Sequence, residues 1–249
     1  MSKKPLSRIA LLGLATGIGA VASAMLAGFG TKFGWWDYRT GFGILRWAAG
    51  TGLAAAALSL LGCFLASRPE RRGLALAATG LVAGILAYAV PASGLNQARS
   101  VPKIHDITTD MANPPAFVAA LEARQKAGAR NSTVYGGDSI ASQQRLAYPD
   151  IKPFTAQDAP DRLFDRALFL ARKSGWEILK ADKQSGRIEA TDTTLWFGFK
   201  DDIVIRVQGD GAGGSRLDIR SVSRVGRSDA GANAARIRQY LAALTGNER

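Results

Sequence analysis

Three long runs of apolar residues dominate the first 96 positions of the chain. Residues 9–29 carry no charged side chain over 21 positions, and residues 47–66 and 73–95 form two further uncharged runs. A helix of that first length rises about 31 Å, which matches the hydrocarbon core of a bilayer. A buried helix of a soluble protein needs only about 10 to 14 apolar residues. The pattern therefore predicts three transmembrane helices, the last two joined as an antiparallel hairpin.

Basic residues near the ends of these runs predict their orientation, because Lys and Arg favour the cytoplasmic side of a membrane. Six basic residues flank one side and five, more thinly spread, flank the other. The two sets are Lys3, Lys4, Arg8, Arg68, Arg71 and Arg72, against Lys32, Arg39, Arg46, Arg99 and Lys103. We expect a bacterial inner-membrane protein with a cytoplasmic N-terminus and a periplasmic C-terminal domain. Cleavage after Ala22-Ser23-Ala24 is the alternative to an uncleaved first span, and it leaves the domain on the same side.

Small residues within the apolar runs are spaced for close helix packing. Gly13 with Gly17, and Gly80 with Gly84, are four positions apart and so share a helix face. Such pairs let helix backbones approach closely, either within one chain or between two copies. We favour packing within the chain, since small residues are common throughout these runs. The runs contain no ionisable residue, which argues against a proton or ion pathway.

The pattern changes after residue 96. Residues 97–160 are polar and contain six prolines, so we expect an irregular connector packed on the domain, with short helices near residues 117–121 and 143–149. Helical periodicity follows from residue 160 to 173. A first strand pattern starts at residue 176 and ends before the turn at residues 185–186. Further strand patterns cover residues 187–197, 203–207 and 215–222, and a last helix is expected from Ser228 or Asp229 to just before Gly246.

These elements predict an α+β fold for the C-terminal part. A three-helix transmembrane segment at residues 1–96 is followed by the connector at 97–160 and by a core at 161–249 with the order helix-β-β-β-β-helix. The core is expected to be a two-layer sandwich of a four-stranded antiparallel sheet and helices, with one sheet face covered. The turns are expected at residues 185–186, 198–201 and 209–214.

Charge and composition narrow the function classes. The net charge of +12 divides into +7 for residues 1–96 and +5 for residues 97–249. Basic residues are not clustered with aromatic ones on the soluble part, so a nucleic-acid partner is not expected. The single cysteine, Cys63, lies in an apolar run, and the single histidine, His105, has only Asp106 and Asp110 nearby. We therefore expect neither a metal site nor a cofactor.

Aspartate and arginine gather in the last part of the chain. Arginine forms two-point bonds with carboxylates and with phosphates, so the set either pairs internally or presents arginine to an anion. Five arginines against four aspartates leave little surplus, and we favour internal pairing. The nine residues are Asp201, Asp202, Arg206, Asp218, Arg220, Arg224, Arg227, Asp229 and Arg236, and all but Asp218 are our candidate ligand-binding residues.

Three stretches resemble catalytic or cofactor motifs. Residues 137–140 are similar to the Gly-Asp-Ser-Leu block of a serine hydrolase family, but the required late histidine is missing. Gly209, Gly211 and Gly214 fit a dinucleotide fingerprint, yet a strand pattern follows them where a helix is needed, so a hairpin loop is expected. Asp201, Asp202 and Asp110 leave a carboxylate-dependent enzyme open as an alternative. We assign no catalytic residue.

Several ordered pieces of residues 101–244 resemble one family. The chain is similar to the uncharacterised family called domain of unknown function 1499, which implies the domain but no activity, cofactor or site residue. The pieces are Ile104-His105-Asp106-Ile107-Thr108-Thr109-Asp110, Asn113-Pro114-Pro115, Tyr148-Pro149-Asp150-Ile151, Gly175-Trp176, Ile188-Glu189-Ala190-Thr191, Phe197-Gly198-Phe199-Lys200-Asp201-Asp202 and the run from Arg220 to Asp229.

These observations favour a membrane-anchored, noncatalytic domain. Its expected partners are a protein of the envelope, a lipid headgroup or a small anionic ligand. The alternatives are the carboxylate-dependent enzyme and a structural membrane subunit whose three spans are the functional part.

Overall fold

The computed structural model describes residues 5–68 and 72–246 and divides into two compact units. The first unit comprises Met1–Asn96 together with Leu195–Gly198, and the second comprises Gln97–Thr194 and Phe199–Arg249. Lys3, Lys4 and Arg71, which contribute to the predicted orientation, lie outside the described residues.

The first unit is built from three helices that are long and apolar enough to cross a membrane, as predicted. They are α1 (Arg8–Lys32), α2 (Tyr38–Ala66) and α3 (Leu74–Ser100). Each helix extends past the uncharged run by several residues. The side chain of Ser7 caps the start of α1, and that of Asp37 caps the start of α2, because each accepts a hydrogen bond from a first-turn amide.

The three helices pack through their glycines. A Cβ atom on Gly80 would lie 2.5 Å from Oγ of Ser59 and 2.8 Å from the backbone nitrogen of Leu14, and one on Gly17 would lie 2.8 Å from the Gly80 carbonyl oxygen. Large apolar side chains point outward instead, with Leu12 56% exposed. Buried small residues and exposed leucines are typical of a membrane helix bundle, and the predicted glycine pairs serve packing within the chain.

The four residues Leu195–Gly198 complete the first unit. The indole nitrogen of Trp196 donates a hydrogen bond of 3.3 Å to the carbonyl oxygen of Met25. The ring of Phe197 lies 5.0 Å from that of Phe42. These contacts give the short aromatic turn a defined place within the unit.

The second unit contains one antiparallel sheet. Its strands are β1 (Asp106–Thr108), β2 (Phe154–Ala156), β3 (Glu177–Asp182), β4 (Arg187–Thr193), β5 (Lys200–Gly209) and β6 (Ser215–Ser223). The order is β1-β6-β5-β4-β3, and β2 also pairs with β6. The four predicted strands are present. The prediction omitted β1 and β2, which the connector contributes.

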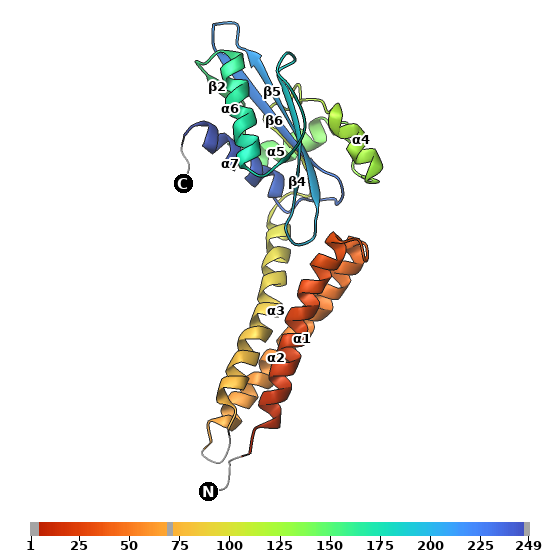
Figure 1. Cartoon of the computed structure of the whole chain (residues 1–249), viewed down its shortest axis with the longest axis vertical. Helices are drawn as coiled ribbons and strands as arrows, with labels where there is room; N and C mark the ends of the chain where they lie inside the picture. Colours follow the sequence, from red (N-terminus) through yellow and green to blue (C-terminus); the bar gives the residue numbers. More distant parts are fainter. Residues whose placement is uncertain (1–4, 69–71, 247–249) are drawn as a thin grey trace. The chain divides into compact units, whose positions relative to one another are not determined.

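The main core lies between this sheet and helices α6 (Pro160–Lys173) and α7 (Ala232–Leu244), which cover the same sheet face (Figure 1). Alternate residues of the central strands point into it, and Ile205 lies between Ile188 and Ile219 in the register of β4, β5 and β6. The stacked rings of Trp176 and Tyr240, with centroids 5.0 Å apart, close the core near the start of β3. The mixed α+β fold is therefore confirmed.

The connector contributes Ile107, Tyr148 and Ile151 to the main core and also covers part of the other face of the sheet, where the sequence predicted no layer. It contains α4 (Ala119–Lys126) and α5 (Asp138–Ala147), and α4 lies on the side opposite to α6 and α7 in Figure 1. A small apolar cluster of Phe117, Ala120, Val204 and Val222 joins α4 to the strands. The layer was missed because its apolar contacts are few and most of its bonds to the sheet are polar.

Three predicted boundaries need correction. Strand β4 ends at Thr193, so residues 194–197 are not part of the strand predicted over residues 187–197. Strand β5 begins at Lys200, so Asp201 and Asp202 lie within a buried strand and not in a turn at residues 198–201. Helix α7 begins at Ala232, because Asp229 acts ahead of it as a cap that accepts bonds from the amides of Gly231 and Asn233. The expected hairpin at residues 209–214 is confirmed by the direct antiparallel pairing of β5 and β6.

Candidate functional site

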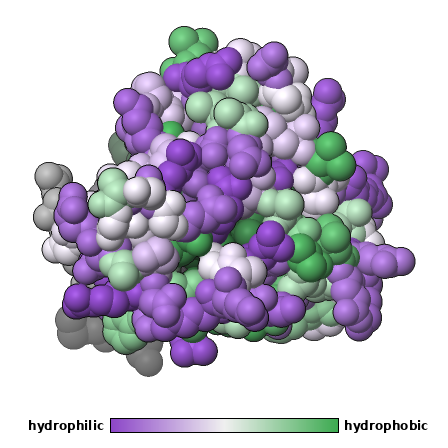
Figure 2. Space-filling model, turned by 90° about the horizontal axis from the view of Figure 1, so that it is seen from above, coloured by the Kyte–Doolittle hydropathy of each residue, from purple (hydrophilic) through white to green (hydrophobic). Residues whose placement is uncertain are grey.

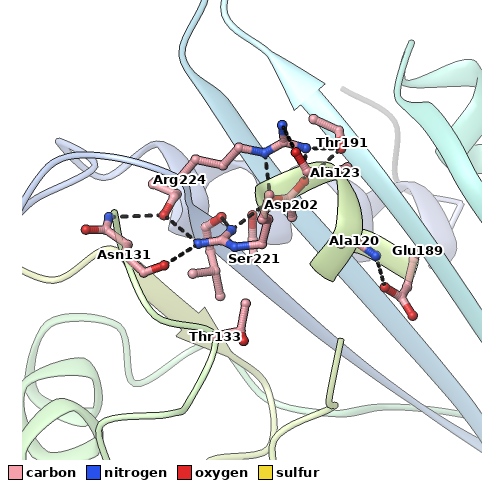
Figure 3. Close-up of polar contacts among 12 residues, drawn as sticks. Ala120, Ala123, Asn131, Thr133, Glu189, Thr191, Asp202, Ser221 and Arg224 are labelled. Carbon is pink, nitrogen blue, oxygen red and sulfur yellow. Dashed lines mark hydrogen bonds and ion pairs between the residues drawn. The ribbon is translucent and has the colours of Figure 1, made fainter. Parts of the chain in front are cut away.

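Asp202 is the centre of a buried polar network. Its side chain is fully buried on β5 and accepts hydrogen bonds from Arg224, the residue after β6, at 2.9 and 2.7 Å, and from Arg124 on α4, at 2.7 Å. The hydroxyl of Thr191 donates a further bond of 2.8 Å. Figure 3 shows Arg224 and Thr191 directed at this carboxylate. The network joins two strands to the connector helix.

Glu189, one strand away, holds the start of α4. Its carboxylate accepts bonds from the amide of Val118 at 2.9 and 3.0 Å and from that of Ala120 at 2.8 Å. Figure 3 shows Glu189 facing the Ala120 amide. The residue at the N-cap position of α4, Val118, has no polar side chain, so a carboxylate from β4 replaces the missing cap.

A second pair fixes the loops before and after α4. The guanidinium of Arg220 binds the Asp106 carboxylate through two bonds of 2.9 and 2.7 Å. It also donates to the carbonyl oxygens of Pro115 and Thr133, and its charged carbon lies 5.3 Å from the ring centre of Phe117. Arg220 is thus surrounded by partners on all sides.

A third group lies further along β6. Asp218 and Asp110 both bind Arg206 and Arg216, with ion-pair distances between 2.9 and 3.0 Å. The Nε atom of Arg206 is buried without a hydrogen-bond partner among the described residues. Asp110 also accepts bonds from the amides of Ala112 and Asn113. It therefore stabilises a turn of the connector in addition to pairing with the two arginines.

The charges of these groups balance. Five acids and five arginines take part in the bonds described above on the α4 side of the sheet, within the described part of the chain. They are Asp106, Asp110, Glu189, Asp202 and Asp218, and Arg124, Arg206, Arg216, Arg220 and Arg224. The arrangement is a structural attachment of the connector to the sheet, and it presents no surplus of positive charge.

Arg236 lies on the opposite, α7 side. Its guanidinium binds Asp192 and Asp201, at 2.8 and 2.7 Å, and donates to Ser221 and Asn233 at 3.0 and 2.6 Å. The structure therefore divides the eight candidate residues. Arg206, Arg220, Arg224 and Asp202 lie on the α4 side, whereas Asp201, Asp229 and Arg236 lie by α7, and Arg227 is exposed.

A pocket of about 330 Å³ opens beside Arg236. It lies where the end of α6, the start of β3 and the end of β4 meet the first half of α7. Its walls are Ser174, Trp176, Asp192, Ala232, Ala235, Arg236, Gln239 and Tyr240. The volume is within the range of about 300 to 1,000 Å³ that is usual for small-molecule sites. The pocket combines an aromatic pair with an ion pair.

Burial raises the pKa values of several titratable groups of the domain, among them Asp229 and Tyr135. Burial raises the pKa of Asp229, and the amide bonds that its carboxylate accepts at the start of α7 oppose the shift. Burial of Tyr135 raises the pKa of its hydroxyl to about 12, and the negative charge of Asp106 adds to the effect. The Tyr135 hydroxyl has no hydrogen-bond partner among the described residues.

The remaining motifs are placed as follows. Asp138 begins α5, and Gly137 before it has a φ of 61°, a left-handed conformation that glycine adopts readily. The carbonyl oxygen of His105 accepts bonds from Ser223 and Asn233. Within residues 5–68 and 72–246, no group of three His, Cys, Asp or Glu side chains is arranged to hold a metal ion.

Sequence reasoning missed Arg124, Glu189 and Asp192, which bind charged or polar groups far away in the chain. Glu189 lies in a quoted family piece, beside Thr191, and Trp176 lies in another, so the resemblance contained part of the signal. The pocket itself had no sequence signal, because its walls come from four separate elements.

Comparison with known proteins gives one match. The family model described as protein of unknown function DUF1499 matches residues 106–244. The match begins at the first residue of β1 and ends at the last residue of α7. No curated protein and no solved structure matches the chain.

Proposed function

Since the chain belongs to the DUF1499 family of proteins of unknown function, we propose a function from its own geometry: a membrane-anchored, noncatalytic binding protein. The proposed ligand site is the pocket between α7 and the start of β3. Three helices hold the protein in the bacterial inner membrane, with the N-terminus in the cytoplasm and the domain in the periplasm.

The observation that carries the binding role is the pocket beside Arg236. Its aromatic wall is rigid, because Trp176 and Tyr240 are stacked, and the Tyr240 hydroxyl donates a 2.7 Å bond to the carbonyl oxygen of Ala167. Its polar wall is fixed by the bonds of Arg236. A preformed pocket costs little ordering on binding, which favours ligand affinity.

The positions of the candidate carboxylates favour binding over catalysis. Asp201 does not line the pocket, and its side chain is 5% exposed and held by Arg236. Asp202 and Asp110 are held by two arginines each on the α4 side, away from the pocket-lining residues. A general base needs access to the proton that it removes. Carboxylates committed to arginines inside the fold are poorly placed for that task.

The face of the molecule seen in Figure 2 supports a position in water for part of the chain. It is mainly hydrophilic, with hydrophobic areas that are small and separate. The helices of the first unit differ, since they expose leucine, isoleucine and valine along their length. The distribution of basic residues supports a cytoplasmic N-terminus.

The binding role is tested by filling the pocket. Ala235→Trp places a large side chain at an exposed position of α7 that lines the pocket, and Ala242→Trp is the matched control at an exposed position of the same helix outside it. The full chain in lipid nanodiscs is screened by ligand-observed NMR with a library of small amines, acids and neutral aromatic compounds. We expect compounds that bind the native chain and the control, and that lose binding to Ala235→Trp. Equal binding to both variants, or no binding to any, refutes the role.

The orientation is tested separately. Protease added to intact spheroplasts is expected to digest the C-terminal domain, whereas inverted membrane vesicles are expected to protect it. The reverse result places the domain in the cytoplasm and refutes the proposed location.

A further inference from the structure

The pocket of the proposed function contains an ion pair with an excess of negative charge. Asp192 on β4 and Asp201 on β5 lie directly opposite each other in the sheet register. Like charges in directly opposed positions repel each other. One guanidinium nitrogen of Arg236 lies between them, 2.8 Å from Asp192 and 2.7 Å from Asp201, and so holds both carboxylates together.

Arg236 has no donor left for a ligand. A guanidinium has five N–H groups. Its Nε donates to Asp192 at 2.9 Å, one terminal nitrogen donates to Ser221 and Asn233, and the other faces Asp192 and Asp201. With every donor directed at a protein group, the arginine cannot form the two-point bond that an anion in the pocket would require.

The excess charge is located at the pocket wall. One arginine against two carboxylates leaves one negative charge in this trio. The side chains of Arg236 and Asp201 are only 8% and 5% exposed, whereas that of Asp192 is 32% exposed and lines the pocket. The accessible part of the excess is therefore the Asp192 carboxylate, and a positive group in the pocket would complete its neutralisation.

We propose that the pocket binds a small organic cation, an ammonium or guanidinium group with apolar substituents. This inference rests on the proposed function and specifies its ligand class, in place of the anionic ligand expected from the arginine-rich sequence. Trp176 and Tyr240 line the pocket next to the carboxylate; the two residues are only 7% and 2% exposed and their rings are stacked on each other, so they offer apolar contact to the substituents of the cation and not an open ring face. The volume is larger than a bare metal ion needs, and the carboxylates already share one arginine.

The test compares a cation with a neutral molecule of the same shape. Choline and 3,3-dimethyl-1-butanol differ in the charged nitrogen, and inorganic phosphate serves as the anion; ethanolamine and agmatine extend the cation set. Binding to the full chain in nanodiscs is measured by saturation-transfer NMR for the native chain, Asp192→Asn and Ala235→Trp. Asp165→Asn is the control, since it removes an exposed carboxylate of α6 that pairs with Lys183 away from the pocket.

We expect at least one cation to bind the native chain, and its dissociation constant to rise about tenfold in Asp192→Asn, because a unit charge near the protein surface contributes energies of that order. Asp165→Asn should leave it unchanged, and 0.5 M salt should weaken it. Neutral isostere binding as strong as that of choline, or preferential binding of phosphate, overturns the cation inference. If the neutral isostere or phosphate binds the native chain but not Ala235→Trp, the pocket is still a binding site, and the proposed function stands although the cation inference has failed. If none of the cations binds, the inference is also overturned, and the wider screen decides the proposed function.

Discussion

Replacing Asp202 by alanine tests the reasoning about the buried network most directly. The substitution removes a fully buried carboxylate and leaves the guanidinium groups of Arg124 and Arg224 without their ion partner, although their side chains are only 5% and 8% exposed. The Thr191 hydroxyl loses its acceptor as well. A buried charge that has lost its ion partner destabilises a folded protein far more than an intact buried ion pair does.

The expected loss can be worked from these contacts. Removing one partner of a buried pair costs about 3 to 5 kcal/mol, and Asp202 serves two arginines. The stability of a domain is about 5 to 15 kcal/mol in total, so the loss is a large fraction of it. Both arginines keep bonds to carbonyl oxygens, of Asn131 and Ala123, which reduces the cost, and we therefore expect about 3 kcal/mol or more.

The measurement is pulse proteolysis of the full chain in detergent across a urea series, which reports the free energy of unfolding of the C-terminal unit. Asp165→Ala is the matched control. It breaks an ion pair of the same 2.7 Å length, but the side chains of Asp165 and Lys183 are 64% and 42% exposed. Exposed pairs contribute little, so the control should behave as the native chain does.

Two results bear on the interpretation. A loss in Asp202→Ala no larger than that in the control refutes the argument that burial makes this network costly to break. In a second variant, Asp202, Arg124 and Arg224 are all replaced by apolar residues of similar size. Because no charge is then left unpaired, it should recover much of the loss.

Three further predictions concern other contacts. Gly80→Val should destabilise the packing of α3 on α1 by about 1 to 3 kcal/mol, because a Cβ atom at this position meets Ser59 and the Leu14 backbone. The loss is measured as faster protease cleavage in detergent. Gly94→Val is the control and should not speed cleavage, since the space around its Cβ position is open. Glu189→Ala should speed amide hydrogen exchange at the start of α4, because the amides there lose their acceptor. Tyr135→Phe should leave the stability of the domain at pH 7 unchanged or slightly higher, since the buried hydroxyl has no partner among the described residues. The same substitution should reduce the loss of stability that occurs above pH 10.

The sign of the last prediction follows from proton linkage. The pKa of Tyr135 is raised from 10.0 to about 12 in the folded chain, so the unfolded chain releases this proton first. The contribution is therefore complete below pH 10 and is lost as the pH rises to about 12. A phenylalanine variant with the same alkaline unfolding curve as the native chain contradicts this assignment.

The sequence alone predicted the elements whose pattern is local. Hydrophobic runs identified the three helices that are long and apolar enough to cross a membrane. Apolar residues bounded by turns indicated β3 and β4, and alternation indicated β5 and β6. The helical periods of α6 and α7 followed in the same way. Residues 209–214 were read correctly as a hairpin, because the pattern after the glycines was that of a strand.

What the sequence did not reveal depends on contacts between distant segments. Strand β1 is three residues long and forms only because β6 offers an open edge to Asp106, Ile107 and Thr108. The cap of α4 comes from Glu189, about 70 positions away, so no local rule finds it. The two aspartates after the aromatic turn resembled solvated turn residues, yet their arginine partners stabilise them inside β5. The same arginines left an anion site open as the alternative to internal pairing, and the partners found for Arg206, Arg220, Arg224 and Arg236 favour pairing.

The attachment of the connector explains why the family model begins where it does. A domain cut at residue 161 would lack Asp106, Asp110 and Arg124, and would leave Arg220, Arg206 and Asp202 without those partners on an uncovered sheet face. Such a face could not be stable, because buried arginines need carboxylates and β6 needs its edge strands. The family match starts at Asp106, the residue that binds Arg220. The connector is therefore part of the fold that the family shares, and the balanced charges between it and the sheet are the means by which it is held.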